Sequence, residues 1–197
     1  MTTCRTTPRV FRSTLAAVVA TLGLSLGQAA PAAGTVPGGN GALAMVHYAR
    51  AKRVLGDPDA AKTTAAEAVR LLEQRRAAGD DSESVIVALA LAYSTQSQIQ
   101  EFLNDPNVLS NSLHAISLLK PLVQTANPSV TARRAYVEVL VRVGFEQLRS
   151  GRFEEAAHSL QLSTRYASEL GAHDLSDFGM AAYFAEADSE DFGFGLW

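Results

Sequence analysis

Histidines are the residues of this 197-residue chain best suited to metal binding or proton transfer. The four positions are His47, His114, His158 and His173. No two of them stand four residues apart on one predicted helix, and none has a glutamate placed as in a helical zinc protease. Each is therefore expected to be a partly exposed helix residue, and we predict no metal site.

Other catalytic and nucleotide-binding patterns are also missing from the sequence. It has no Gly-x-x-x-x-Gly-Lys-Ser/Thr loop for phosphates and no serine in a Gly-x-Ser-x-Gly context. Adjacent acids such as Asp80-Asp81 and Glu154-Glu155 fall at predicted turns or helix starts, where carboxylates complement the helix dipole. We therefore expect a protein that is not an enzyme and needs no cofactor.

Arginines are the residues whose spacing does suggest binding. Arg142 and Arg149 are seven residues apart, so they share one face of a helix, and Glu138 precedes Arg142 by four residues. A guanidinium group binds carboxylates with two parallel hydrogen bonds. These residues would suit an extended peptide with a carboxylate or an acidic side chain. The alternative is that the arginines are solvated surface residues.

The composition indicates a folded protein with an acidic body. Apolar residues make up 47% and charged residues 19%, which suits one globular domain. The net charge is −3, and without the three arginines near the N-terminus the count is 14 basic and 20 acidic residues, or −6. An acidic body argues against nucleic-acid binding. The only cysteine, Cys4, lies in the leader, so the mature chain would have no disulfide or thiolate metal site.

Segment 1–32 has the pattern of a secretory signal peptide. Residues 1–14 carry three arginines and no acid, residues 15–27 are mostly apolar, and small residues follow. Cleavage is expected after Ala29 or Ala32, which would place the mature protein in the periplasm or outside the cell. The alternative is an uncleaved membrane anchor, although the apolar run is shorter than the ~20 residues of a typical spanning helix.

From Ala42 onward the chain is predicted to be helical nearly throughout, after a flexible lead-in over 33–41. Good helix formers dominate, apolar residues recur at three- and four-residue spacing, and Gly, Asn, Asp and Pro mark the breaks. Pro121 is expected to kink its helix or to shorten it from the front, and Gly171 suits a helix end. The expected helices span 42–55, 59–78, 83–103, 109–126, 129–149, 152–170 and 174–187.

The last helix pair before Gly171 carries the clearest repeat. Gly144 lies midway along the first helix, and Ala156, Leu160 and Ser163 follow on the second, after the turn Gly151-Arg-Phe-Glu-Glu-Ala. This arrangement resembles the tetratricopeptide repeat, a 34-residue helix pair whose small residues let the two helices approach closely. The resemblance implies an all-α fold of antiparallel helix pairs, stacked as a short right-handed α-solenoid.

Two further, degenerate units are expected within a domain over 42–187. A unit over 42–75 repeats the turn as Gly56-Asp-Pro-Asp-Ala-Ala. The middle unit fits only with an insertion of about 11 residues in the polar stretch 94–112. Three units are near the minimum for a stable solenoid, because each buries its apolar face on a neighbour.

The C-terminal region is expected to end the stack. Helix 174–187 would cover the last open face with Leu175, Phe178 and Ala182. The following tail, 188–197, is acidic and aromatic. It is either a frayed end or a short linear motif that a partner or the groove captures.

The resemblance also implies a binding groove, because the first helices of successive repeats line a concave face in this family. Carried over by position, the candidate groove residues are Val46, His47, Arg50, Arg53, Leu89, Tyr93, Gln96, Glu138, Val141, Arg142, Phe145 and Arg149. The predicted function is that of an exported adaptor or scaffold that binds a peptide or protein segment. Alternatives are a membrane-tethered sensor or assembly subunit, and a helical bundle that binds a small molecule or catalyses without a local signature.

Overall fold

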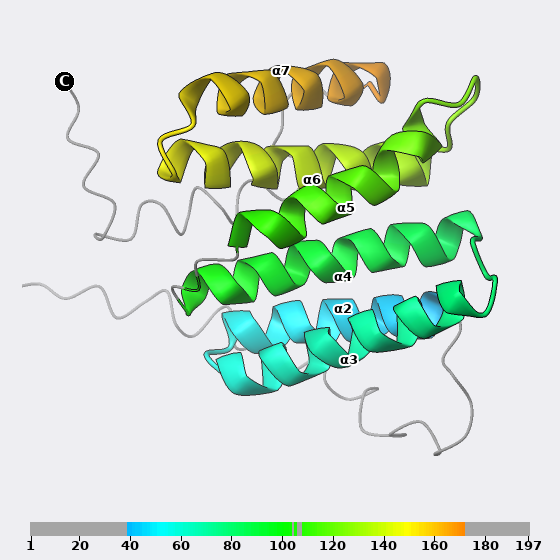
Figure 1. Ribbon diagram of the computed structural model, residues 1–197, viewed down its shortest axis with the longest axis vertical. Coiled ribbons are helices and arrows are strands. Elements are labelled where there is room, and N and C mark those ends of the chain that lie inside the picture. Colours follow the sequence, from blue (N-terminus) through cyan, green and yellow to red (C-terminus); the bar gives the residue numbers. More distant parts are fainter. Residues whose placement is uncertain (1–38, 104, 106–107, 172–197) are drawn as a thin grey trace, which may run out of the picture. The chain divides into compact units, whose positions relative to one another are not determined.

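A computed structural model describes residues 39–103, 105 and 108–171, and every regular element in these ranges is an α-helix (Figure 1). This confirms the prediction of an all-α fold for the described part of the chain. None of the described helices is both long and apolar enough to cross a membrane. The six helices are α2 (Gly39–Val54), α3 (Pro58–Ala77), α4 (Glu83–Phe102), α5 (Val108–Val123), α6 (Val130–Arg149) and α7 (Phe153–Glu169).

Helix boundaries differ by more than one residue from the predicted ones at two places. α2 begins at Gly39, so residues 39–41 are helical although they were predicted as part of the flexible lead-in. α5 is also shorter than predicted at its back and not at its front, because it begins at Val108 and ends at Val123, two residues after Pro121. Proline lacks the N–H that would bond to the carbonyl four residues earlier, and its ring crowds that carbonyl, so Pro121 weakens the turn of α5 that precedes it.

Several predicted segments lie outside the described residues. They are the signal peptide 1–32, most of the lead-in, the capping helix 174–187 and the tail 188–197. The polar stretch 94–112, by contrast, is largely described. Its first part continues α4 and its last part begins α5.

The turns at the ends of α2 and α6 are alike. Gly56 and Gly151, 95 positions apart, have φ of 79° and 74°, a left-handed conformation that favours glycine. In each turn the N–H after the glycine bonds to the carbonyl five residues earlier, at 3.0 Å and 2.8 Å respectively. This pattern satisfies carbonyls that a helix end leaves without partners. The two turns that suggested a repeat in the sequence therefore have the same backbone hydrogen bonds.

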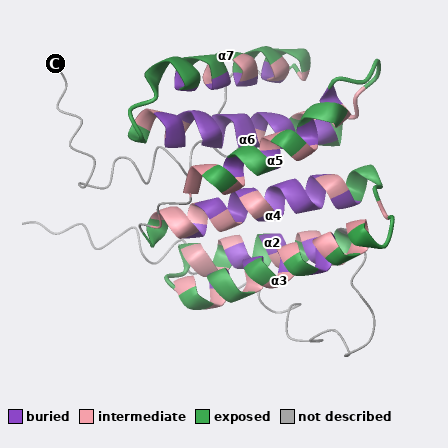
Figure 2. Cartoon of the chain, viewed as in Figure 1, coloured by how far each residue is buried: buried purple, intermediate pink, exposed green. Residues whose placement is uncertain are grey.

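The helices form two sets, one of α2, α4 and α6 and the other of α3, α5 and α7. α2, α4 and α6 contact one another in series, α3 contacts α2 and α4, α5 contacts α4 and α6, and α7 contacts α6. Buried side chains are most frequent on α4 and α6, the two helices that contact the most other helices (Figure 2). The main core joins α2 to α6, and its largest fully buried apolar side chains are Leu72, Leu89, Leu119, Val46, Val85, Val139 and Val143.

Close packing of α6 on α7 depends on Gly144. A Cβ atom at this position would lie 2.7 Å from Cγ and 2.8 Å from Cδ2 of Leu160, closer than side chains tolerate. The carbonyl of Ala156 is only 3.6 Å from the same point. The small residue that the repeat pattern requires here is therefore needed for direct contact between the two helices.

Replacing Gly144 with valine should destabilise the protein by about 1–3 kcal/mol, because the added atoms overlap Leu160. The free energy of unfolding would be measured by urea denaturation. In the double variant Gly144→Val/Leu160→Ala the overlap is relieved, so the two effects should be less than additive by about 1 kcal/mol. Additive losses of stability would show that Leu160 does not restrict the size of the side chain at position 144.

Candidate binding face

Arg50 connects the three helices of one set. Its Nε donates a hydrogen bond to Oγ1 of Thr95 on α4 at 2.9 Å, and its Nη2 lies 2.6 Å from Oε1 of Glu138 on α6. The side chains of Arg50 and Glu138 are 23% and 28% exposed, whereas Thr95 and Nη2 of Arg50 are buried, so this link lies just beneath the surface. Two predicted groove residues, far apart in the sequence, are thus brought into direct contact.

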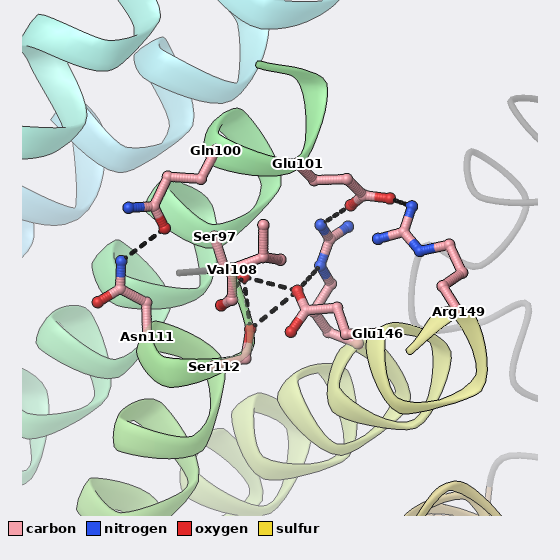
Figure 3. A network of polar contacts seen from close by, with 9 residues as sticks. Ser97, Gln100, Glu101, Val108, Asn111, Ser112, Glu146 and Arg149 are labelled. Carbon is pink, nitrogen blue, oxygen red and sulfur yellow. Dashed lines mark hydrogen bonds and ion pairs between the residues drawn. The ribbon is translucent and has the colours of Figure 1, made fainter. Parts of the chain in front are cut away.

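Glu101, near the end of α4, connects two further predicted arginines. One of its carboxylate oxygens contacts Nη2 of Arg142 and the other contacts Nη1 of Arg149 (Figure 3). Both arginines belong to α6. The glutamate and Arg149 are partly exposed, whereas the side chain of Arg142 is only 5% exposed. We call the partly exposed surface formed by Arg50, Glu101, Glu138 and Arg149 the charged face, and the fully buried Thr95 supports it from beneath.

Beneath this face lies a buried polar network around Glu146 (Figure 3). Its Oε1 accepts a hydrogen bond from Nε of Arg142 at 2.7 Å. Two hydroxyl groups, of Ser97 on α4 and Ser112 on α5, lie 2.6 Å and 3.0 Å from the same oxygen. Ser112 Oγ also lies 2.8 Å from Ser97 Oγ, which in turn is 2.7 Å from the carbonyl of Val108. Glu146 is therefore charge-compensated although its side chain is only 2% exposed.

The charges of this region are balanced within the chain. Arg50, Arg142 and Arg149 contact Glu138, Glu101 and Glu146. The sequence suggested arginines that are free to bind a ligand carboxylate, or that are solvated. The structure instead engages each of them with a glutamate. Glu138, which precedes Arg142 by four residues on α6, contacts Arg50 of α2.

The predicted groove residues of α4 lie on other sides of the helix. Tyr93 points to α3 and α5. Its hydroxyl donates a hydrogen bond to Oε1 of Glu73 on α3 at 2.9 Å, and its ring packs edge-on against that of His114 on α5, with 4.6 Å between the ring centroids. Burial and this carboxylate raise the pKa of Tyr93 to about 12. Gln96 lines a small cavity against α3, and Leu89 is fully buried in the core. Thr95, which was not predicted, is the α4 residue that contacts Arg50, and it is fully buried beneath the charged face.

The remaining predicted residues are divided between surface and core. His47 is exposed and stands one turn before Arg50 on α2, and Arg53 is half-buried. Val46 is fully buried in the main core. Val141 and Phe145 belong to an apolar cluster that α6 shares with α7. Of the twelve predicted residues, only four lie in the charged face or its buried network: Arg50, Glu138, Arg142 and Arg149.

No cluster of three or more His, Cys, Asp or Glu side chains suited to a metal ion occurs among the described residues. His173 lies outside them.

Known proteins gave no match. Neither family models, nor curated proteins, nor solved structures are similar to this chain at a significant level. The candidate site therefore rests on the residues and their geometry.

The partners of the arginines were not predicted from the sequence, and only one spacing in the sequence pointed to any of them. Glu146 stands four residues after Arg142, a spacing that predicts contact on a helix. Ser97 and Ser112 gave no such signal, because isolated serines occur commonly on exposed helix faces. Glu101 pairs with residues more than 40 positions away, so no local spacing points to it.

Replacing Glu146 alone with leucine should cost about 3–5 kcal/mol, because it removes a buried partner of the guanidinium of Arg142. The double variant Arg142→Met/Glu146→Leu should recover most of this loss. It leaves Ser112 bonded to Ser97, Ser97 bonded to Val108, and Glu101 paired with Arg149.

The free energies of unfolding from urea denaturation check this prediction. Glu101→Gln is a useful comparison, since it changes a partly exposed carboxylate of the same group and should cost less. If the double variant is as unstable as Glu146→Leu, the loss does not come from leaving Arg142 without its partner. The ion pair would then contribute stability that apolar side chains of similar size do not replace.

Proposed function

We propose that this protein is an exported, tetratricopeptide-like interaction module that binds a protein or peptide segment on its charged face. In this proposal α2–α3, α4–α5 and α6–α7 are antiparallel helix pairs, stacked as a short right-handed α-solenoid. The observation that carries the proposal is the contact of α2, α4 and α6 in series, joined by Arg50 through Thr95 and Glu138.

Further support comes from the first and last pairs. A small residue lies on the first helix of each pair at positions 95 residues apart, Ala49 in α2 and Gly144 in α6. Ala61 and Ala156 occupy matching buried positions on the second helices, 95 positions apart. Repeated pairs of this kind generally present their first helices as one continuous surface.

Because its charges are balanced, the charged face would bind a mixed polar segment better than a purely acidic one. Arg149 contacts Glu101 through one nitrogen, whereas a guanidinium carries five N–H donors. A peptide carbonyl or carboxylate can use donors that remain, while a ligand amide or amine bonds to Glu101 or Glu138. Affinity would then come from many modest contacts on a preformed scaffold.

Site-specific photo-cross-linking in cells tests which surface is used. A photoreactive residue would replace His47, which is exposed one turn before Arg50, and in a second variant Gln98, three residues after Thr95. The control replaces His158, an equally exposed histidine on α7. The same partner should be cross-linked from positions 47 and 98 and not from 158, since only the first two stand next to the charged face.

Partner adducts that form from position 158 and not from the other two would contradict the proposal. As a second measurement, Arg50→Ala should reduce the adduct formed from position 98, because it removes the link between α2, α4 and α6.

Export is the second part of the proposal, and it rests on the order of basic, apolar and small residues in segment 1–32. Expressed in a Gram-negative host, the chain should appear in the periplasm, shortened after Ala29 or Ala32 as measured by intact mass. Leu22→Arg, which interrupts the apolar run, should leave a full-length precursor in the cytoplasm. Leu22→Ala is the matched control and should be exported normally.

A full-length, membrane-bound product would overturn the soluble module. It would support the tethered alternative, in which the same helical domain serves a sensor or an assembly subunit.

A further inference from the structure

Large apolar side chains gather at one end of the helices, at the turns that follow α2, α4 and α6. Arg149, the last residue of α6, contacts Glu101 in the last turn of α4, and Arg50 near the end of α2 bonds to Thr95 of α4. These three helices therefore end on the same side (left in Figure 1). Five of the eight large apolar side chains that are exposed in the described part of the chain lie at these turns. We call them the apolar edge: Val54, Leu55, Phe102, Leu103 and Phe153.

The apolar edge is well exposed and has a recess beside it. Phe102 and Phe153 are 57% and 64% exposed, and Val54 is 63% exposed. Isolated apolar side chains are common on protein surfaces, but a group of them at one place usually marks a contact site. A hollow of about 110 Å³ adjoins the group, because Leu103 lines it together with the buried Ile99. The edge therefore offers apolar surface, with a recess beside it, to another apolar segment.

The charges around the apolar edge are of both signs. Lys62 and Arg152 are exposed there, and so are Asp59, Glu154 and Glu155. As a group, these charges favour neither an acidic nor a basic segment. A segment that docks on the edge would therefore be held by burial of apolar surface.

The C-terminal part of the chain is long enough to reach the apolar edge. α7 begins there with Phe153 and leads away from it over 17 residues, or about 25 Å (Figure 1). Gly171 then has a φ of 75°, like Gly56 and Gly151, each of which precedes a further helix. The predicted helix 174–187, which lies outside the described residues, would be about 21 Å long and would lead the chain back. Without it the distance is also covered, since 26 residues follow Gly171 and about eight extended residues span this length.

The C-terminal tail, residues 188–197, carries large apolar side chains at alternate positions. Its sequence is Asp188-Ser-Glu-Asp-Phe-Gly-Phe-Gly-Leu-Trp197. In an extended backbone alternate side chains point to the same side, so Phe192, Phe194 and Leu196 would form one stripe with ~6.6 Å between neighbours. Such a stripe spans about 13 Å, and packed helices lie about 8–10 Å apart, so it suits an edge built from the ends of neighbouring helices. The glycines between these residues leave the other side of the tail without bulky groups.

We propose that the C-terminal tail docks on the apolar edge of its own chain. The stripe of the tail would contact the exposed side chains of the edge, and Trp197 would be withdrawn from water beside them. A tethered tail has a local concentration of about millimolar, so even a weak apolar contact would be largely occupied. The edge is then a contact site within the molecule and not a surface left open for a membrane or a partner.

Fluorescence of Trp197 tests the proposal directly, because it is the only tryptophan of the chain. In the purified protein its emission should be shifted to shorter wavelength, and acrylamide should quench it several times less than in the free peptide 188–197. Both differences should persist in high salt, because the contact depends on apolar surface and salt screens only charges. Emission and quenching equal to those of the peptide would overturn the proposal.

Phe153→Ser and Val130→Ser form a matched pair of variants. Both side chains are 64% exposed and both stand at the first position of a helix, but Val130 begins α6, at the other end of the helices. Phe153→Ser, like Phe102→Ser, should move the emission of Trp197 towards that of the peptide and raise its quenching, whereas Val130→Ser should change neither. All three side chains are exposed, so the fold is expected to be kept, and circular dichroism checks this. Protection of Trp197 that survives both phenylalanine variants would place the tail elsewhere and overturn the proposal.

The tail of a second copy is the main alternative occupant of the apolar edge. Quenching would therefore be measured over a wide range of dilution, with the mass in solution from analytical ultracentrifugation. A monomer in which Trp197 stays protected supports the proposal. Protection that is lost as a dimer dissociates assigns the edge to another copy and overturns docking within the chain. No binding partner is present in these measurements, so their outcome is independent of the proposed protein-binding function.

Discussion

The carboxylate of Glu146 is the point on which the arrangement of the middle helices depends. It lies in the interior, and a buried charge is strongly unfavourable unless it is paired and hydrogen-bonded. Its partners come from three helices, Arg142 on α6, Ser97 on α4 and Ser112 on α5. A shift of α4 or α5 by one residue would remove a hydroxyl from this oxygen. The network therefore favours one register for helices whose apolar surfaces would tolerate several.

Local features of the fold could be predicted from the sequence, and the reason is that they depend on neighbours in the chain. Gly56 and Gly151 mark helix ends because the left-handed turn excludes most other residues. Gly144 was assigned to a close helix contact, and the distance to Leu160 bears this out. Such signals occupy a few consecutive positions, or recur at helical spacing, so one sequence is enough to find them.

The face of α4 could not be predicted in the same way. Residues on all sides of this helix are buried, from Val85 to Ile99, so apolar periodicity does not identify a single inward face. Its orientation was instead carried over from the repeat resemblance, through the most degenerate unit. Each residue turns a helix by about 100°, so Tyr93 and Gln96 point well away from Thr95. The long-range partners of the arginines were missed for a related reason, since contacts such as Ser97 with Glu146 leave no trace in local spacing.

A charge-balanced face has consequences for how a partner would be recognised. A groove of free arginines attracts any acidic segment, and such binding weakens steeply with salt. Here Glu101 and Glu138 already form ion pairs with the arginines, so a purely acidic ligand would have to displace carboxylates that are held in place. A segment that supplies both a donor and an acceptor at the right spacing displaces only water. Selectivity would then depend on the order of polar groups in the partner and less on its net charge. The same internal pairs hold α2, α4 and α6 together, so the surface that we propose for partner binding is also the one that fixes the spacing of the helices beneath it.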